Sequence, residues 1–263
     1  MRTRIPSATV GANGTAGRPH VPSGSRVYAV GDIHGRADLL DRLLEEMAGD
    51  LASWVPRRAV VVFLGDYVDR GPESRRVVER LASGPPSAGP LATAQWVALR
   101  GNHEDYVLRF LSDCSIGPGW FLNGGLETVR SYIGSIPPGL ETDTRTLQRL
   151  LAEAMPPDHV RFLSRLPLSH TEGDYLFVHA GVRPGVPLAR QDPQDMMWIR
   201  DEFLHSREAF GKVVVHGHSA LPTPEMRPNR IGVDTGAWRS GRLTALVLEG
   251  ADRRFLRTRA PDG

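Results

Sequence analysis

Short apolar runs recur along the chain and are separated by polar, Gly- and Pro-containing segments. Runs of this length are typical of buried β-strands. They predict seven strands, at residues 26–30, 59–64, 95–99, 175–178, 212–215, 230–233 and 243–248. Apolar residues spaced three and four positions apart predict helices between them. The predicted helices are 38–47, 74–81, one starting near Glu104, 144–155 and 158–166.

Strands that alternate with helices favour a layered α/β fold. Residues 112–167 interrupt this alternation with Gly-rich turns around 117–125 and two helical patterns. We interpret this segment as a mostly helical insert that covers one edge of the site. The expected organisation is a disordered leader at 1–25, a single domain at 26–257 and a tail at 258–263.

Composition narrows the class of protein. The 263 residues include 32 Lys and Arg and 30 Asp and Glu, so the net charge of +2 gives no case for a nucleic-acid partner. One cysteine excludes an intrachain disulfide. No apolar run is long enough to span a bilayer, and no secretory signal follows the basic start. These features predict a cytoplasmic location without a membrane partner.

Five of the predicted strands end in glycine-flanked polar residues. Because the carboxyl ends of parallel strands share one edge of a sheet, these side chains are expected to converge. In chain order the candidates are Asp32 and His34, Asp66 and Asp69, Asn102 and His103, His179, and His216 and His218.

Oxygen and imidazole ligands without thiolates suit Mn, Fe or Zn. Asp32 and His34, two positions apart, project to the same side of an extended segment and can hold one ion together. These candidates are too many for one tetrahedral site, and six of them used as ligands would suit two ions about 3.5 Å apart that share a carboxylate. The charge remaining on two such ions favours a phosphate ester as the substrate.

These blocks resemble the signature blocks of the PPP-type metallophosphatases, within the calcineurin-like phosphoesterases. The blocks are GDIHG at 31–35, GDYVDRG at 65–71, LRGNHE at 99–104, HAG at 179–181 and GH at 217–218, and the resemblance spans roughly 27–249. It is strongest with small bacterial and phage-lambda-like serine/threonine protein phosphatases. It implies a four-layer α/β/β/α sandwich and a dinuclear centre of two divalent ions, with Mn favoured over Fe or Zn.

The resemblance also implies a role for each site residue. It assigns Asp32 and His34 to the first metal, Asp66 to the bridge between the metals, and Asn102, His179 and His218 to the second metal. It makes His103 the general acid and Asp69 the residue that orients it. Arg70 and Arg200 correspond to arginines that hold the substrate phosphate.

Several residues have simpler interpretations. Asn102 could cap the following helix, and Arg200 could pair with Asp201 or Glu202 at the surface. We interpret His216 as a residue that packs or supports a metal ligand, and Glu104 as one that orients a neighbour or starts its helix and does not bind metal. Trp120, Phe121, Trp198 and Trp238 are expected to pack in the core or at its rim and not to form a recognition platform.

The predicted function is that of a metal-dependent phosphomonoesterase, a serine/threonine protein phosphatase that uses a hydroxide activated by two metals on a phosphorylated protein or peptide. The first alternative is a dinucleoside polyphosphate hydrolase of the diadenosine tetraphosphate type. The second is a phosphate-binding scaffold without activity. The Ser-Ala-Pro-Asn-Tyr segment of the eukaryotic enzymes is absent, and GVDTGA stands at 232–237. The sequence does not fix the oligomeric state.

Overall fold

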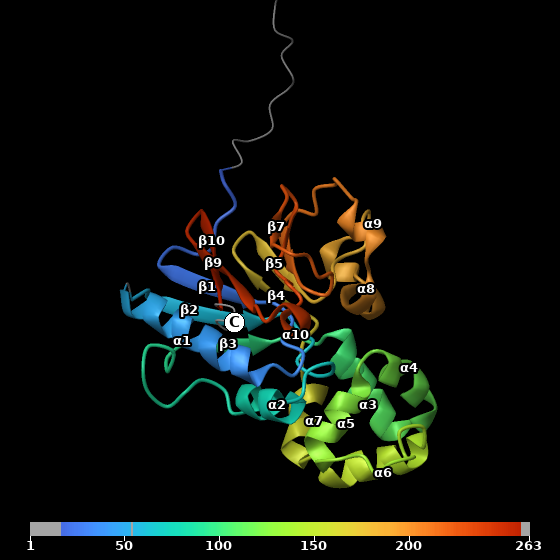
Figure 1. Cartoon of the computed structure of the whole chain (residues 1–263). Coiled ribbons are helices and arrows are strands. Elements are labelled where there is room, and N and C mark those ends of the chain that lie inside the picture. The colour runs from blue at the N-terminus through green and yellow to red at the C-terminus, as the bar shows by residue number, and fades with distance from the viewer. Residues whose placement is uncertain (1–16, 54, 259–263) are drawn as a thin grey trace, which may run out of the picture.

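The computed structural model describes residues 17–53 and 55–258. Within them the chain forms two five-stranded sheets that lie face to face (Figure 1). Sheet A has the strand order β10-β9-β1-β2-β3, and sheet B has the order β4-β5-β6-β8-β7.

Sheet A has a parallel half and an antiparallel half. The parallel strands are β1 (Ser25–Val30), β2 (Arg58–Phe63) and β3 (Gln95–Ala98). On the other side of β1, β9 (Thr244–Glu249) runs antiparallel to β1, and β10 (Asp252–Arg257) runs antiparallel to β9. Because β1, β2 and β3 are parallel, their carboxyl ends all lie at the same edge of the sheet.

Sheet B has a parallel centre between two antiparallel edge strands. Three parallel strands, β5 (Tyr175–Val178), β6 (Val213–His216) and β8 (Arg230–Gly232), form its centre. Two antiparallel strands, β4 (Ser169–Glu172) and β7 (Glu225–Met226), form its edges. The seven predicted strands are therefore divided between two sheets, and three strands, β4, β7 and β10, were not predicted.

Alternating side chains along the strands create the layers. In β1, Val27 and Ala29 face the core between the sheets, whereas Tyr28 and Val30 face the helices that cover sheet A. Those helices include α1 (Ala37–Ser53) and α2 (Ser74–Ala82). On sheet B, Leu176 and Val178 pack in the opposite direction, against α8 (Pro193–Trp198) and α9 (Asp201–Leu204). The predicted four-layer α/β/β/α sandwich is confirmed (Figure 1).

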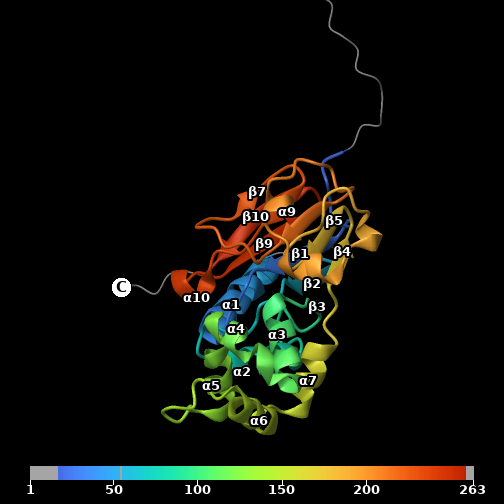
Figure 2. The same ribbon diagram turned by 90° about the vertical axis from the view of Figure 1, so that its right-hand side faces the viewer.

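A group of helices lies at one end of the sandwich, below the sheets in Figure 2. It comprises α3 (Asn102–Ser112), a short 3-10 turn (Cys114–Ile116), α4 (Gly117–Leu122), α5 (Gly125–Ile133), α6 (Thr144–Ala154) and α7 (Pro157–Ser164). The prediction of turns around 117–125 is wrong, because most of these residues belong to α4 and α5.

Residues 1–16 of the predicted leader lie outside the described part of the chain, as do 259–263 of the predicted tail. The described residues before β1 contact the sandwich: Val21 is buried and its N–H donates to the Gly250 carbonyl at 3.0 Å. The Tyr175 hydroxyl donates to the Pro19 carbonyl at 3.0 Å. Among the described residues, no helix is both long and apolar enough to cross a membrane.

Candidate metal centre

The carboxyl ends of parallel strands from both sheets meet at one edge and bring the polar blocks together. Two groups of three side chains result, His34 with Asp66 and His103, and Asp66 with His179 and His218. Within each group the candidate ligand atoms lie within 4.8 Å of one another, and all these residues are buried. Asp66 belongs to both groups, in the position that the sequence analysis assigned to a bridging carboxylate.

The second group is compact. His179 Nε2 lies 3.2 Å from Asp66 Oδ1, 3.0 Å from Asn102 Oδ1 and 3.2 Å from His218 Nδ1. Four potential ligand atoms from β2, α3, β5 and β6 or the loops after them therefore surround one point. Two oxygens and two imidazole nitrogens are a donor set that Mn, Fe or Zn accepts.

Main-chain carbonyls fix how two of the imidazoles present their nitrogens. His34 Nδ1 lies 2.8 Å from the Val68 carbonyl, and His179 Nδ1 lies 2.9 Å from the Leu64 carbonyl. A carbonyl only accepts, so each Nδ1 carries a proton and each Nε2 points toward the cluster. Protein metal sites commonly orient their histidines in this way. This arrangement fits a bound cation.

Asp32 lies beside the two groups and belongs to neither. Its carboxylate accepts the His218 N–H, with N···O distances of 3.0 and 3.2 Å. Burial raises the pKa of Asp32 well above its usual value, and the nearby charges of Asp234 and Asp66 raise it further. Burying like charges together is costly unless a cation or protons neutralise them.

Asp234 is a site residue that the sequence analysis did not identify. It is 5 % exposed, and its carboxylate accepts the Gly236 N–H at 2.8 Å. Burial raises the pKa of Asp234, and the charge of Asp66 adds to the effect. The sequence held a signal for it, because Asp234 follows the predicted strand 230–233 just as Asp32 and Asp66 follow theirs.

The surroundings of Asp66 and His34 determine which protonation state each of them adopts. Burial alone would raise the pKa of Asp66, but the neighbouring His179 and His103 outweigh it and hold that pKa well below its ordinary value. Burial lowers the pKa of His34 well below 6.5. Asp66 is therefore an anion and His34 a neutral imidazole, the forms in which each binds a metal.

His103 and Asp69 are in direct contact, with 2.5 Å between His103 Nδ1 and Asp69 Oδ2. Asp69 is completely buried and is held by Trp120 Nε1 at 2.7 Å and Thr128 Oγ1 at 2.5 Å, which both donate to its carboxylate. Burial alone would lower the pKa of His103, but Asp66 and Asp69 outweigh it and raise that pKa above 6.5. Trp120 packs in the core as expected and also fixes Asp69.

Two arginines reach the centre. Arg70 donates from Nη1 to His34 Nε2 at 2.8 Å and lies 3.2 Å from His103 Nε2 through Nη2. Arg200 is exposed, and its Nη1 donates to the His218 carbonyl at 3.3 Å. Glu202 pairs with Arg183 at 2.9 Å. No ion pair joins Arg200 to Asp201 or Glu202 in the described chain, so the surface pairing considered for Arg200 is not found.

Backbone strain concentrates at this centre. Five non-glycine residues in the described part of the chain have φ in the left-handed region, and all five are predicted site residues: His34, Asp66, Asp69, Arg70 and His218. Such conformations cost on the order of 1–3 kcal/mol each and persist where surrounding contacts enforce them, often at functional sites. The fold therefore tolerates destabilising backbone conformations at the residues whose side chains form this centre.

The start of α3 settles two of the open alternatives. The helix begins at Asn102 and its N-cap is Gly101, so Asn102 is not the cap and its side chain reaches His179. Glu104 accepts the N–H groups of Asp66 at 2.8 Å, Tyr67 at 2.7 Å and Gly101 at 2.9 Å. Glu104 thus orients its neighbours, as expected.

His216 lies outside both ligand groups. Its ring packs edge-on against Phe203 with 5.0 Å between centroids, and burial lowers its pKa to about 4. The interpretation of His216 as a packing residue is confirmed.

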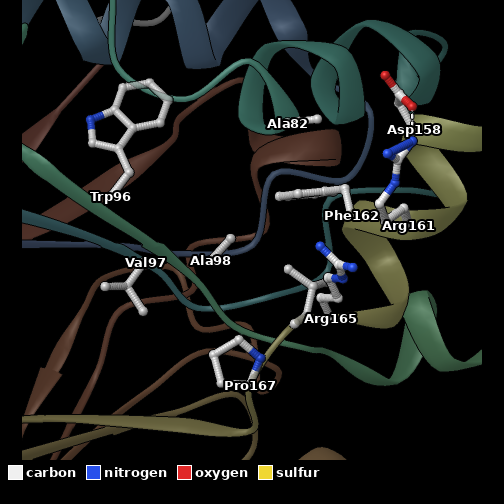
Figure 3. Close-up of a pocket in the computed structure, with 10 residues that line it drawn as sticks. Ala82, Trp96, Val97, Ala98, Asp158, Arg161, Phe162, Arg165 and Pro167 are labelled. Carbon is white, nitrogen blue, oxygen red and sulfur yellow. Dashed lines mark hydrogen bonds and ion pairs between the residues drawn. The ribbon is translucent and has the colours of Figure 1, made fainter.

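A separate pocket of about 500 Å³ lies at the open edge of β3 (Figure 3). Residues of β3, of α7 and of the segment after α7 form its walls, among them Trp96, Ala98, Phe162 and Arg165. It contains none of the predicted site residues. The polar cluster at the strand ends is therefore the better candidate for a catalytic site.

Comparison with known proteins agrees with this geometry. Residues 25–240 match the family model described as calcineurin-like phosphoesterase. A bis(5'-nucleosyl)-tetraphosphatase PrpE of the asymmetrical type from Bacillus cereus (strain AH820) is 27 % identical, over 82 % of this chain and 88 % of that protein. A symmetrical bis(5'-nucleosyl)-tetraphosphatase from Dechloromonas aromatica is 32 % identical, over 60 % of this chain and 44 % of that protein.

Solved structures share the fold. A crystal structure provisionally assigned as a diadenosine tetraphosphatase superimposes with a TM-score of 0.60 and 24 % identity, covering 89 % of this chain and 94 % of that one. A protein serine/threonine phosphatase from Saccharomyces cerevisiae superimposes with a TM-score of 0.50 and 14 % identity, over 91 % of this chain and 81 % of that one. With its four-layer sandwich, its His and Asp cluster and its family match, the chain belongs to the calcineurin-like phosphoesterase family and is a metallophosphoesterase.

Proposed function

We propose that this metallophosphoesterase hydrolyses dinucleoside polyphosphates, adding water across a phosphoanhydride bond to release two nucleotides. The observation that carries the proposal is the similarity to PrpE from Bacillus cereus, which extends over 82 % of this chain and 88 % of that protein. The symmetrical enzyme from Dechloromonas aromatica supports the same substrate class. This favours the first alternative of the sequence analysis over the serine/threonine protein phosphatase.

We assign the metal ligands by their geometry. His34 and the shared Asp66, with Asp32 beside them, would hold one ion, and Asp66, Asn102, His179 and His218 the other. Two divalent ions would lower the pKa of a coordinated water and neutralise charge on the substrate phosphates. Hard oxygen and borderline nitrogen ligands favour Mn, with Fe or Zn as alternatives.

His103 is the proposed general acid. The carboxylate of Asp69 accepts from His103 Nδ1, which leaves Nε2 directed toward the cluster to give a proton to the leaving phosphate oxygen. Against the effect of burial, the carboxylates of Asp66 and Asp69 raise the pKa of His103, which favours its protonated form. Asp69 acts as the positioning residue, because two further donors fix its carboxylate.

Arg70 and Arg200 are the proposed phosphate-binding residues. Arg70 approaches the His34 side of the cluster and Arg200 the His218 side, so the two guanidinium groups flank it. A polyphosphate chain carries several negative charges, and guanidinium groups bind phosphate oxygens in a bidentate manner. Two arginines at the two ends of the cluster suit an extended anionic chain.

The test compares three substrates on the enzyme loaded with Mn²⁺. We expect kcat/KM for diadenosine tetraphosphate to exceed that for a phosphoserine or phosphothreonine peptide at least tenfold, with p-nitrophenyl phosphate as the small reference ester. Product analysis then distinguishes ATP plus AMP from two ADP. A higher kcat/KM for the phosphopeptide would refute the proposal and restore the protein phosphatase. Absence of hydrolysis on all three would favour the scaffold.

A further inference from the structure

A small pocket lies directly beside the second ligand group. It has a volume of about 350 Å³ and lies between α8 and α9, with Trp198 and Arg200 in its wall. The Trp198 ring lies 6.3 Å from the ring of His218 and packs edge-on against Tyr106 at 5.3 Å. The indole of Trp198 therefore forms one wall of the pocket, and its ring lies next to that of His218, a proposed metal ligand.

The polar lining of this pocket has unused hydrogen-bonding capacity. Arg183 is already paired, with Asp195 at 2.6 Å and Glu202 at 2.9 Å. The side chains of Gln194 and Asp201 also line the pocket, and neither makes a side-chain hydrogen bond to another described residue. Amide and carboxylate groups of this kind recognise the ring edges of nucleobases.

A second aromatic ring flanks the first ligand group. Trp238 belongs to the short helix α10 (Ala237–Ser240) and is 40 % exposed. The Arg70 guanidinium carbon lies 5.6 Å from the centre of its ring, and Arg70 itself contacts His34 and His103.

Each ligand group thus has its own arginine and its own tryptophan. Arg70 and Trp238 stand beside the group of His34, and Arg200 and Trp198 stand beside His218. A dinucleoside polyphosphate has the matching order of parts, with one base at each end of an anionic chain. Stacking of a base on an aromatic side chain contributes about 1–3 kcal/mol and tolerates different bases.

We infer that Trp198 and Trp238 are two nucleobase seats, in which the pocket between α8 and α9 holds one base and the exposed face of Trp238 holds the other. This inference rests on the proposed function for its substrate. Arg200 and Arg70 then contact the phosphates between each base and the cluster. With a base bound on each tryptophan, both ends of the dinucleotide would contribute to binding. The two arginines contact only the phosphates.

The first test compares Trp198→Ala and Trp238→Ala with the wild type on two substrates. For diadenosine tetraphosphate we expect kcat/KM to fall about 5- to 100-fold, mainly through KM, because base stacking is lost. The fall on p-nitrophenyl phosphate, which has no nucleobase, should be much smaller. Trp198→Phe and Trp238→Phe should restore most of the loss. Met226→Ala, which truncates a side chain that is 42 % exposed on β7, is the control for surface truncation.

The second test does not depend on hydrolysis of the dinucleotide. AMP and ribose 5-phosphate share a sugar phosphate and differ by the base, so the ratio of their inhibition constants against p-nitrophenyl phosphate measures base binding alone. We expect AMP to inhibit the wild type at least fivefold more strongly, and at least one Trp→Ala variant to bring the ratio close to one.

The outcomes separate the seats from the proposed function. If the wild type hydrolyses diadenosine tetraphosphate and both variants lose equal activity on both substrates, the tryptophans only support the centre and the inference is wrong. Unchanged inhibition ratios in both variants would also overturn it. If the wild type does not hydrolyse the dinucleotide, the proposed function fails, and the AMP ratio still decides whether the seats bind a base.

Discussion

Single residues around the cluster act mainly by fixing their neighbours. Carbonyls of Leu64 and Val68 select the tautomers of His179 and His34, and Trp120 and Thr128 fix the carboxylate of Asp69. Loss of such supporting contacts in metal sites typically lowers metal affinity or activity 10- to 100-fold. Substitutions of residues that do not touch substrate are therefore informative.

Asp234→Asn is the first such substitution. Asp234 places a third buried carboxylate beside Asp32 and Asp66, and this negative charge should strengthen cation binding. We expect the Mn²⁺ concentration for half-maximal activity to rise about tenfold or more, with little change in turnover at saturating metal. Titration of activity with Mn²⁺ measures this. An unchanged metal requirement would show that Asp234 is structural.

His103→Asn tests the proposed acid. The substitution removes the titrating imidazole and keeps a polar side chain, so metal content should stay close to that of the wild type. Turnover should fall about 10²- to 10⁴-fold, the usual contribution of general acid–base catalysis. Turnover and metal content are measured on the same preparation, with Tyr106→Phe as the control on the same helix. Full activity of His103→Asn on diadenosine tetraphosphate and an aryl phosphate would exclude His103 as the acid.

At the scale of elements, the site depends on how the end of β2, the end of β3 and the start of α3 are joined. Glu104 makes this connection, since its carboxylate accepts N–H groups from residues 66, 67 and 101. Glu104 is completely buried, so water cannot replace these bonds.

Glu104→Ala should therefore leave three buried donors without partners. Each costs about 1–3 kcal/mol, so we expect the free energy of unfolding to fall by at least about 3 kcal/mol. Urea denaturation measures it. Glu104→Gln keeps the shape and one acceptor oxygen and should lose less. A loss below about 1 kcal/mol in Glu104→Ala would contradict the role given to this residue.

The elements also show what a sequence can predict. Strand 175–178 agrees with β5 residue for residue, because an uninterrupted buried run marks its own ends. Helices α4 and α5 were missed because glycine normally favours turns. Here Gly125 starts α5 and its position is set by packing, since a Cβ there would lie 2.5 Å from the Trp120 ring. Only the tertiary structure reveals this contact.

The site likewise contains residues that the sequence predicts and residues that only the structure reveals. The residues of the five blocks converge because parallel strands end at a common edge, which the sequence pattern predicts. Trp120 and Thr128 approach Asp69 from a helical segment more than fifty positions away, and no local signal marks them. Asp234 follows a short strand without a neighbouring histidine, so its block did not stand out.

At the scale of the molecule, the two sheets are joined by ion pairs as well as by the core between them. Arg58 at the start of β2 binds both carboxylate oxygens of Glu172 in β4, each at 2.7 Å, and His170 Nε2 lies 2.8 Å from the same carboxylate. Burial alone would raise the pKa of Glu172, but the bonds from Arg58 and His170 outweigh it and lower the pKa below 4.5.

This lowered pKa predicts a pH-dependent stability. The pair stabilises the folded chain fully above the unfolded-state pKa of 4.5, and the stabilisation is lost as the pH falls through the lower folded-state value. Glu172→Gln should therefore be less stable than the wild type by about 1–2 kcal/mol at pH 7. The difference in melting temperature should vanish in acid. A difference that stays constant from pH 7 to pH 3 would contradict this origin.

The central claim is that chain segments from both sheets hold two metal ions around Asp66. Anomalous diffraction from crystals grown with Mn²⁺ tests it most directly. The claim predicts two peaks about 3.5–4 Å apart, both within coordination distance of Asp66, one beside His34 and the other among Asn102, His179 and His218. A single peak, no peak at this edge, or two ions bound away from Asp66 would contradict it.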